Sequence, residues 1–353
     1  MRRAYRPVCV VLVLLCAGLM SNVAAPAWAC GCGAYIPDRA GAAVVDERAL
    51  IAWDGRTEDI LMSFGVTGSS ERAAWVMPVP SAARVTLGDN AVFDDLAALT
   101  APRVEYRDSW WPTFSWLTEG SAGPSDGVGA RPPGGVSVLA TQRIGPFEVT
   151  RLTGDNSAGL AAWLGEHGFP QPATLDENLA PYVEQGWEIV AIQLAPDDTG
   201  VLTGALQPLR LSFASDTVVY PMRLSRAATV PQAVQLSVLA EHRMDPSTVP
   251  VAGTEPTLRY AGRLDAQTAP ESLAPYLESG AFLTSWTDVI REPAQIDGDY
   301  VFTRSGDDTA YQQVVYRVRD RGDLTGAALI LVVVAAALGG AAVLWARRSR
   351  QAR

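Results

Sequence analysis

The sequence of 353 residues contains no lysine, only two histidines and four cysteines. This scarcity limits the catalytic mechanisms and metal sites that the protein could have. The histidines, His167 and His242, are accompanied by no Gly-x-Ser-x-Gly elbow that would supply a nucleophilic serine. The sequence also lacks a His-Glu-x-x-His, P-loop or Gly-x-Gly-x-x-Gly motif. We therefore expect both histidines to be structural or at the surface. No catalytic residue and no cofactor is predicted.

Acidic residues are absent from the beginning of the chain. Three arginines precede an apolar core at residues 8–20, and residues 27–29 read Ala-Trp-Ala, a small-x-small cleavage site. This order is typical of a secretory signal peptide. We predict a signal peptide at 1–29, with cleavage that leaves Cys30 as the first residue.

The end of the chain lacks charge over a long run and then becomes basic. No charged residue occurs from Leu324 to Trp345, and a helix needs about 20 apolar residues to cross a bilayer. Four arginines lie in the tail that follows, which favours a cytoplasmic C-terminus. The sequence therefore predicts a single transmembrane helix at 324–345, a cytoplasmic basic tail at 346–353, and a cell-membrane protein whose N-terminal domain lies outside.

The predicted external part, residues 30–323, is strongly acidic. It contains all 38 acidic residues and 21 of the 28 arginines, so its net charge is 21 minus 38, or −17. Such a surface argues against nucleic acid as a partner. The partners that remain are the membrane and an envelope ligand or partner protein.

The external part shows short strands and short helices in mixed order. Strands are predicted at Ala49 to Trp53, Asp59 to Val66, Ala73 to Val79, Phe147 to Leu152, Trp187 to Leu194, Leu209 to Phe213, Thr217 to Tyr220 and Gln235 to Ala240. Helices are predicted after Asn90, around Trp163 and from Leu175 to Gln185. Because no regular βαβ alternation occurs, we predict an α+β fold of mixed, mainly antiparallel sheets with short helices.

The organisation of this part into domains stays open. We expect a first part at 30–104, a Trp-rich and then Gly/Pro-rich loop or linker at 105–140, and a second part at 141–323. The phrase Leu-Ala-Pro-Tyr occurs twice, at 179–182 and 273–276. We interpret this echo as a recurring helix stop rather than as a duplicated unit. Whether the parts form one domain or two is left open.

The pair Cys30-Gly31-Cys32 is the strongest candidate for chemistry. Cys9 and Cys16 lie in the signal peptide, so this pair alone remains and a four-sulfur zinc site is excluded. Outside the cytoplasm a structural disulfide is expected. A disulfide over one intervening residue is strained and more easily reduced, so thiol-redox or metal chemistry is the alternative, and lipid attachment to Cys30 is a third.

Three acidic turns begin at Asp197, Asp297 and Asp307. None has the twelve-residue spacing of a calcium-binding loop, so we expect solvated turns and no metal site.

Three tryptophans, Trp110, Trp111 and Trp116, cluster at the start of the expected loop. Their rings suit three environments: stacking on sugar rings, resting among lipid headgroups, or covering the core. They are the candidate ligand contacts.

Several uncommon phrases occur in one order along the external part. They are Cys30-Gly31-Cys32-Gly33-Ala34, Trp53-Asp54-Gly55-Arg56-Thr57-Glu58, Ala74-Trp75-Val76-Met77-Pro78-Val79-Pro80-Ser81, Gly145-Pro146-Phe147, Trp163-Leu164, Pro208-Leu209-Arg210-Leu211 and Tyr220-Pro221-Met222-Arg223-Leu224-Ser225. With these phrases the sequence resembles the bacterial domain-of-unknown-function 2330 family. The resemblance implies a signal peptide, an external domain and a C-terminal membrane helix. It implies no activity, because the family has no assigned catalytic residues.

Two classes of function are consistent with these patterns. The first is a non-enzymatic binding or structural protein of the cell envelope, with Trp110, Trp111 and Trp116 as its contacts. The alternative is an envelope thiol-redox or metal-handling protein that uses Cys30 and Cys32. The ligand, the oligomeric state and the chemical state of Cys30 are not determined by the sequence.

Overall fold

The computed structural model describes most of the chain after the first 32 residues. The described residues are 33–39, 41–68, 70–114, 143–144, 147–152, 157–194, 202, 204–277 and 280–351. They fall into two compact units. The first, which we call the β-domain, comprises the described residues between 33 and 101 and between 143 and 312; the second, the ribbon–helix unit, comprises the described residues 102–114 and 313–351.

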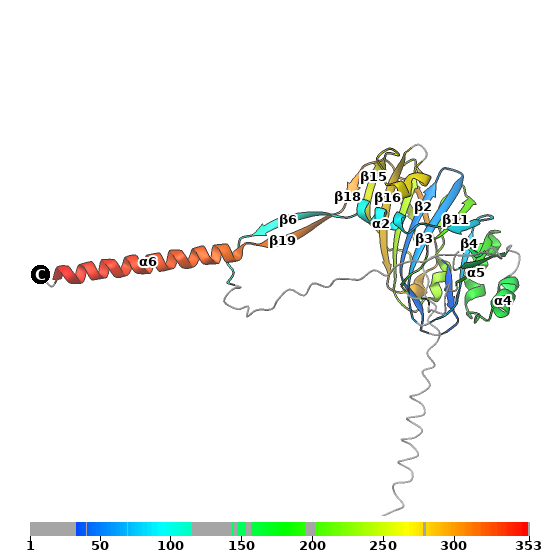
Figure 1. Ribbon diagram of the computed structural model, residues 1–353, viewed down its shortest axis with the longest axis horizontal. Helices are drawn as coiled ribbons and strands as arrows, with labels where there is room; N and C mark the ends of the chain where they lie inside the picture. Colours follow the sequence, from blue (N-terminus) through cyan, green and yellow to red (C-terminus); the bar gives the residue numbers. More distant parts are fainter. Residues whose placement is uncertain are drawn as a thin grey trace, which may run out of the picture. The chain divides into compact units, whose positions relative to one another are not determined.

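A nine-stranded sheet forms the centre of the β-domain (Figure 1). Eight of its strands follow the order β18-β15-β16-β13-β2-β3-β11-β5, and β10 pairs with β3. The strands are β2 (Ala43–Trp53), β3 (Thr57–Thr67), β5 (Arg84–Leu87), β10 (Gly204–Ala205), β11 (Leu209–Ala214), β13 (Gln232–Ala240), β15 (Thr257–Leu264), β16 (Ala281–Ile290) and β18 (Tyr311–Gln312). Its neighbouring strands are antiparallel except β13 and β2, which are parallel.

Two smaller antiparallel sheets complete the strands of the β-domain. A five-stranded sheet has the order β1-β4-β9-β8-β7 and a three-stranded sheet the order β12-β17-β14. Their strands are β1 (Ala34–Pro37), β4 (Ala73–Val79), β7 (Arg143–Ile144), β8 (Phe147–Leu152), β9 (Glu188–Leu194), β12 (Val218–Tyr220), β14 (Met244–Thr248) and β17 (Tyr300–Arg304).

The helices of the β-domain are short. They are α2 (Ala91–Leu99), α4 (Ser157–Glu166), α5 (Leu175–Glu184) and the 3-10 turns η1 (Arg223–Ala227), η2 (Glu271–Tyr276) and η3 (Pro293–Gln295). Figure 1 shows α4 and α5 together beside β4. All seven residues of β4 are buried, so this strand is covered on both faces.

The alternation of strand residues divides the interior into two cores. On β3, Ile60 and Met62 point into the larger core, which includes residues of the five-stranded sheet, α4 and α5. Leu61 points the other way, into a second core that contains residues of α2 and η2. Successive strand residues face opposite sides of a sheet, so a continuously apolar strand is stable only where both faces are covered.

The ribbon–helix unit consists of two strands and one long helix. β6 (Arg103–Ser109) and β19 (Val314–Asp320) form a parallel pair, and α6 (Gly322–Gln351) follows β19 directly (Figure 1). Neither strand pairs with any other described strand.

The α+β prediction is confirmed: most pairs are antiparallel, the helices of the β-domain are short, and one long apolar helix lies at the C-terminus. The eight expected strands and three expected helices are present, with ends that differ by a few residues. The domain boundaries stay a prediction. Residues 105–109 of the expected loop lie in β6.

Candidate functional site

The Trp segment, residues 110–114, directly follows β6 in the ribbon–helix unit. The side chains of Trp110 and Trp111 are 56% and 80% exposed, which is unusual for indole rings. Large exposed apolar patches mark sites of contact with other molecules or with a membrane, and two adjacent exposed indole rings contribute such a surface.

Parallel pairing of β6 and β19 determines where the Trp segment lies. The register begins with Arg103 opposite Val314 and ends with Ser109 opposite Asp320. Because both strands run in the same direction, the residues after Ser109 lie level with those after Asp320. The Trp segment is therefore adjacent to the first turn of α6.

Backbone hydrogen bonds connect the end of β6 and the Trp segment to the start of α6. The Arg321 amide donates to the Ser109 carbonyl oxygen at 2.8 Å, and the Thr113 amide donates to the Gly322 carbonyl oxygen at 3.0 Å. These two bonds continue the β-pairing up to the point where the helix begins.

Side-chain hydrogen bonds add to this attachment. The Thr325 hydroxyl donates to the Trp110 carbonyl oxygen at 2.9 Å, and the Thr113 hydroxyl donates to an Asp323 carboxylate oxygen at 3.1 Å. With three hydrogen bonds to the first turn of α6, and one more between Ser109 and Arg321 just before it, the segment has a defined backbone position.

Two glycines one helical turn apart allow the segment to lie against the helix. A Cβ atom on Gly322 would come within 2.2 Å of the Trp111 carbonyl oxygen, and one on Gly326 within 2.1 Å of the Thr113 carbonyl oxygen. Real Cβ atoms do not approach backbone oxygens this closely. Positions i and i+4 share one helix face, so Gly322 and Gly326 together form the surface on which the segment rests.

The strands of the ribbon are stabilised by contacts between their own side chains. The Arg107 guanidinium lies 3.7 Å from the centre of the Tyr316 ring on one face, and that of Arg319 lies 4.6 Å from the Tyr106 ring on the other. Asp108 is within ion-pair distance of Arg319, at 4.0 Å. Each face is thus covered by an arginine stacked on a tyrosine, an arrangement suited to solvent.

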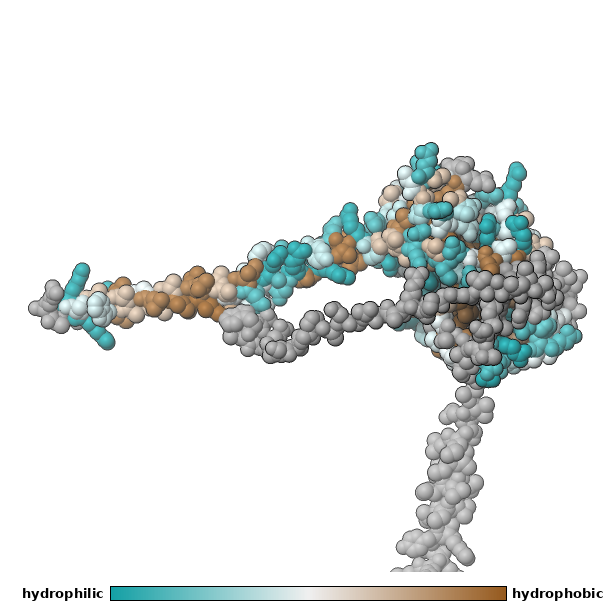
Figure 2. Space-filling model, in the orientation of Figure 1, coloured by the Kyte–Doolittle hydropathy of each residue, from teal (hydrophilic) through white to brown (hydrophobic). Residues whose placement is uncertain are grey.

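Beyond the first turns, where Gly322 and Gly326 are buried, helix α6 is apolar as far as Trp345 and its side chains are not buried. It is long enough and apolar enough to cross a membrane, with a mean hydropathy of 2.7 over its most apolar window and none of that window buried. Figure 2 shows the hydrophobic surface that extends along it. A helix that exposes apolar side chains on all sides is stable in lipid rather than in water.

A different kind of site occurs inside the β-domain, where Asp299 joins several segments. Its carboxylate accepts hydrogen bonds from the Tyr182 hydroxyl at 2.5 Å and from the Met222 amide at 2.6 Å. It also accepts from the Arg223 amide at 3.3 Å and from Arg223 Nε at 3.2 Å. Burial, followed by the charge of Asp299, raises the pKa of Tyr182, so this hydroxyl stays a donor.

Two further carboxyl groups lie in the interior. Glu58 is fully buried, and both of its oxygens lie 3.3 Å from the Val219 amide. Burial raises the pKa of Glu58 well above its ordinary value, against the opposing effect of that hydrogen bond. The Tyr220 hydroxyl donates to buried Glu47. Each carboxyl group is thus engaged with a neighbouring strand, as expected of groups that organise the interior.

The histidines have structural surroundings. The ring of His167 stacks on Trp163, and its Nδ1 lies 2.8 Å from the carbonyl oxygen of that residue. His242 Nδ1 lies 2.9 Å from Asp308, which also accepts the Arg243 amide at 2.9 Å. Within the described part of the chain, no group of three or more histidine, cysteine or acidic side chains is arranged to hold a metal.

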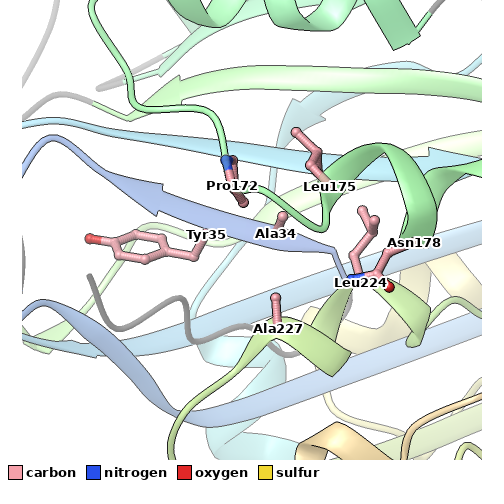
Figure 3. Close-up of a pocket in the computed structure, with 7 residues that line it drawn as sticks. All are labelled: Ala34, Tyr35, Pro172, Leu175, Asn178, Leu224 and Ala227. Atoms are coloured by element: carbon pink, nitrogen blue, oxygen red, sulfur yellow. The ribbon is translucent and has the colours of Figure 1, made fainter. Parts of the chain in front are cut away.

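A small pocket of the β-domain is lined mainly by apolar side chains (Figure 3). Its lining residues are Ala34, Tyr35, Pro172, Leu175, Asn178, Leu224 and Ala227. Its volume of about 10 Å³ is close to the minimum needed for one water molecule. This pocket is too small for a substrate.

The predicted site residues are thus only partly placed. Trp110 and Trp111 lie side by side in sequence at the start of α6, whereas Trp116, Cys30 and Cys32 lie outside the described residues. The role of Gly322 and Gly326 was not predicted, although their Gly-x-x-x-Gly spacing is a visible signal in the sequence.

Taken together, the described residues define a β-rich α+β protein with one C-terminal helix that is able to span a membrane. The chain belongs to a bacterial family described as an uncharacterized protein conserved in bacteria (DUF2330), which it matches over residues 26–303. No curated protein matches the chain. Among solved structures, the crystal structure of baculovirus P35 aligns with 78% of this chain and 98% of its own, at 8% sequence identity and a TM-score of 0.33. A likeness this low supports no argument about function.

Proposed function

We propose that this chain is a single-pass membrane protein whose β-domain lies outside the cytoplasm as a non-enzymatic binding or structural component of the cell envelope. The observation that carries the proposal is α6, whose apolar side chains are exposed around the whole helix. Burying such a helix in lipid removes a large apolar surface from water.

The direction of insertion follows from charge. Arginines follow the apolar run of α6, and the acidic residues of the whole chain precede that run. Positively charged residues next to a membrane helix are retained on the cytoplasmic side. The proposed signal peptide at 1–29 would start export of the β-domain in the same orientation.

The interior of the β-domain supports a binding or structural role over catalysis. The carboxyl groups of Glu58 and Asp299 lie away from bulk solvent, but each already accepts a hydrogen bond from a backbone amide of the β-domain. The donors are the amides of Val219 and Met222. Groups of this kind set the positions of strands and loops, and they are not presented to a substrate.

Membrane fractionation and a topology assay test this proposal. The full chain, expressed in a bacterium, should stay in the membrane after carbonate washing. A C-terminal fluorescent protein should be active and a C-terminal alkaline phosphatase inactive, because only the former works in the cytoplasm. Placing arginine at both Leu331 and Val334, which are exposed in the middle of α6, should release the protein to the soluble fraction.

A conservative variant is the control for the double arginine substitution. Changing Leu331 and Val334 to isoleucine should leave the protein in the membrane. Release of the unmodified chain by carbonate would contradict anchoring, and an active C-terminal phosphatase would contradict the orientation. Intact mass of the membrane-extracted protein should show a chain that begins at Cys30, and loss of two thiol hydrogens would establish the disulfide.

A further inference from the structure

The two ends of the apolar run in α6 differ in their aromatic residues. Trp345 ends the run and is 75% exposed, whereas residues 322–344 include no aromatic residue at all. Tryptophan is enriched at both interfaces of membrane proteins, because its ring is apolar and its N–H is polar. The helix itself supplies such a residue at only one of its ends.

The Trp segment supplies the missing aromatic residues at the other end. The Thr325 hydroxyl binds the Trp110 carbonyl oxygen, so the segment is level with the point where the apolar run begins. From Leu324 to Trp345 a helix extends about 33 Å, close to the thickness of the hydrocarbon core. When Trp345 lies at one interface, Trp110 and Trp111 lie at the other.

We infer that the Trp segment is the protein's anchor in the external lipid interface, with the indole rings of Trp110 and Trp111 among the lipid headgroups. This inference rests on the proposed spanning of the membrane by α6. Lipid headgroups are a better partner for the segment than sugar rings. The reason is that the segment is hydrogen-bonded to the membrane helix itself, next to the start of its apolar run.

The charge around the segment indicates which lipids suffice. The two parts of the ribbon–helix unit at residues 102–114 and 313–326 contain five arginines and four carboxylates. Several of these pair internally, as Arg321 does with Asp108 at 3.7 Å. A nearly neutral surface gains little electrostatic binding energy from anionic lipid, so we expect it to bind zwitterionic phosphatidylcholine as well.

Fluorine NMR of the full chain tests the inference. The protein is labelled with 5-fluorotryptophan and placed in phosphatidylcholine nanodiscs, and the resonances of Trp110 and Trp111 are assigned from their phenylalanine variants. A lipid with a gadolinium-labelled headgroup should broaden both resonances as strongly as it broadens that of Trp345. A water-soluble gadolinium chelate should broaden them less than it would a solvent-exposed indole.

Internal controls separate this inference from the anchoring proposal. Trp75, which is 1% exposed inside the β-domain, should be affected by neither reagent. If the labelled lipid broadens Trp345 but not Trp110 and Trp111, α6 spans the membrane and the inference is wrong. If Trp345 is also unaffected, the anchoring proposal fails. Shifts of Trp110 and Trp111 on addition of peptidoglycan fragments, without broadening by the lipid, would assign the segment to a glycan instead.

A pair of glycine variants tests whether docking on the helix positions the rings. Gly326→Ala places a Cβ atom against the Thr113 carbonyl oxygen, so the segment should detach and the lipid effect on Trp110 and Trp111 should weaken. Gly339→Ala is the matched control, because a Cβ atom there meets nothing within 4 Å. Trp345 should be unchanged in both. Unchanged Trp110 and Trp111 resonances in Gly326→Ala would overturn the docking step.

Discussion

The β-domain and the ribbon–helix unit both contain β-strands, but they stabilise them in opposite ways. All seven residues of β4 in the β-domain are buried, whereas six of the seven residues of β19 in the ribbon are exposed. The first kind of strand is stabilised by removal of apolar surface from water, the second by arginine–tyrosine stacking, ion pairs and attachment to a helix. An isolated pair of strands is marginal in water, so these surface contacts have a larger share in its stability.

The largest contrast is expected for tryptophan removal in the two units. Trp75→Ala empties a fully packed site in the larger core and should lower the free energy of unfolding by about 3–5 kcal/mol. Trp111→Ala removes an exposed ring and should change the free energy of unfolding by less than about 0.5 kcal/mol. Denaturant unfolding of the detergent-solubilised chain measures both. Similar losses would show that the two units are not stabilised differently.

Loss of the Asp299 carboxylate should have the next largest effect. Asp299→Asn replaces one of two acceptor oxygens by an amide NH₂. The variant therefore loses either the bond from Arg223 Nε, which Oδ2 accepts, or the bonds from the Tyr182 hydroxyl and the Met222 amide, which Oδ1 accepts. We expect a loss of about 2 kcal/mol in the free energy of unfolding. Asp297→Asn, at an exposed position two residues away, is the control and should have little effect. Equal stability of the two variants would mean that Asp299 does not organise its neighbours.

The buried Glu58 should make the β-domain pH-dependent in a defined direction. Its pKa is raised in the folded state, so the folded protein holds a proton that the unfolded chain loses above about pH 4.5. Its contribution to stability is therefore largest at low pH and decreases as pH rises toward the folded pKa. Glu58→Gln, which cannot ionise, should become more stable relative to the wild type over this range.

Urea unfolding of both proteins across the pH range measures the difference. Glu58→Ala provides the matched comparison, because it leaves the buried Val219 amide without its acceptor and should be about 1–3 kcal/mol less stable than Glu58→Gln at every pH. A constant difference between wild type and Glu58→Gln would show that the pKa of Glu58 is the same in the folded and unfolded states.

The smallest effect is expected in the ribbon. Arg107→Gln removes the cation stacked on Tyr316 and should weaken the strand pair by about 0.5–1 kcal/mol without changing the unfolding of the β-domain. Hydrogen exchange should accelerate at the amides of β6 and β19 and stay unchanged in the β-domain. Arg304→Gln, an exposed substitution in β17, is the control. Unchanged exchange in β6 would show that the stacking adds nothing to the pair.

Local elements were predictable because their signals are local. Asp54-Gly55 indicated a turn between two strands, and Asp54 Oδ1 indeed accepts the amides of Arg56 and Thr57, with Gly55 at a φ of +94°. The helix expected after Asn90 is α2, and it buries Val92, Phe93 and Leu96 on one face, as predicted. Each of these depends on residues within a few positions of one another.

Contacts between distant segments were not predictable from these patterns. The phrase Leu-Ala-Pro-Tyr occurs in the α-helix α5 and in the 3-10 turn η2. In α5, Tyr182 is buried and bonded to Asp299. In η2, Tyr276 lies under the guanidinium of Arg210, at 5.0 Å. The same four residues therefore acquire different structures and partners from tertiary packing, and the Asp299 network could not be read from them.

The parallel pairing of the ribbon also sets an order of events during biosynthesis. Thr113 and its hydrogen-bond partner Asp323 are 210 residues apart, and a chain emerges from the ribosome with its N-terminus first. The β6 strand, with Val104 and Tyr106, and the Trp segment that follows it therefore stay unpaired until the sequence of the β-domain has been made. A chain truncated before residue 314 lacks β19, so an unpaired backbone edge on β6 distinguishes an incomplete chain from a complete one.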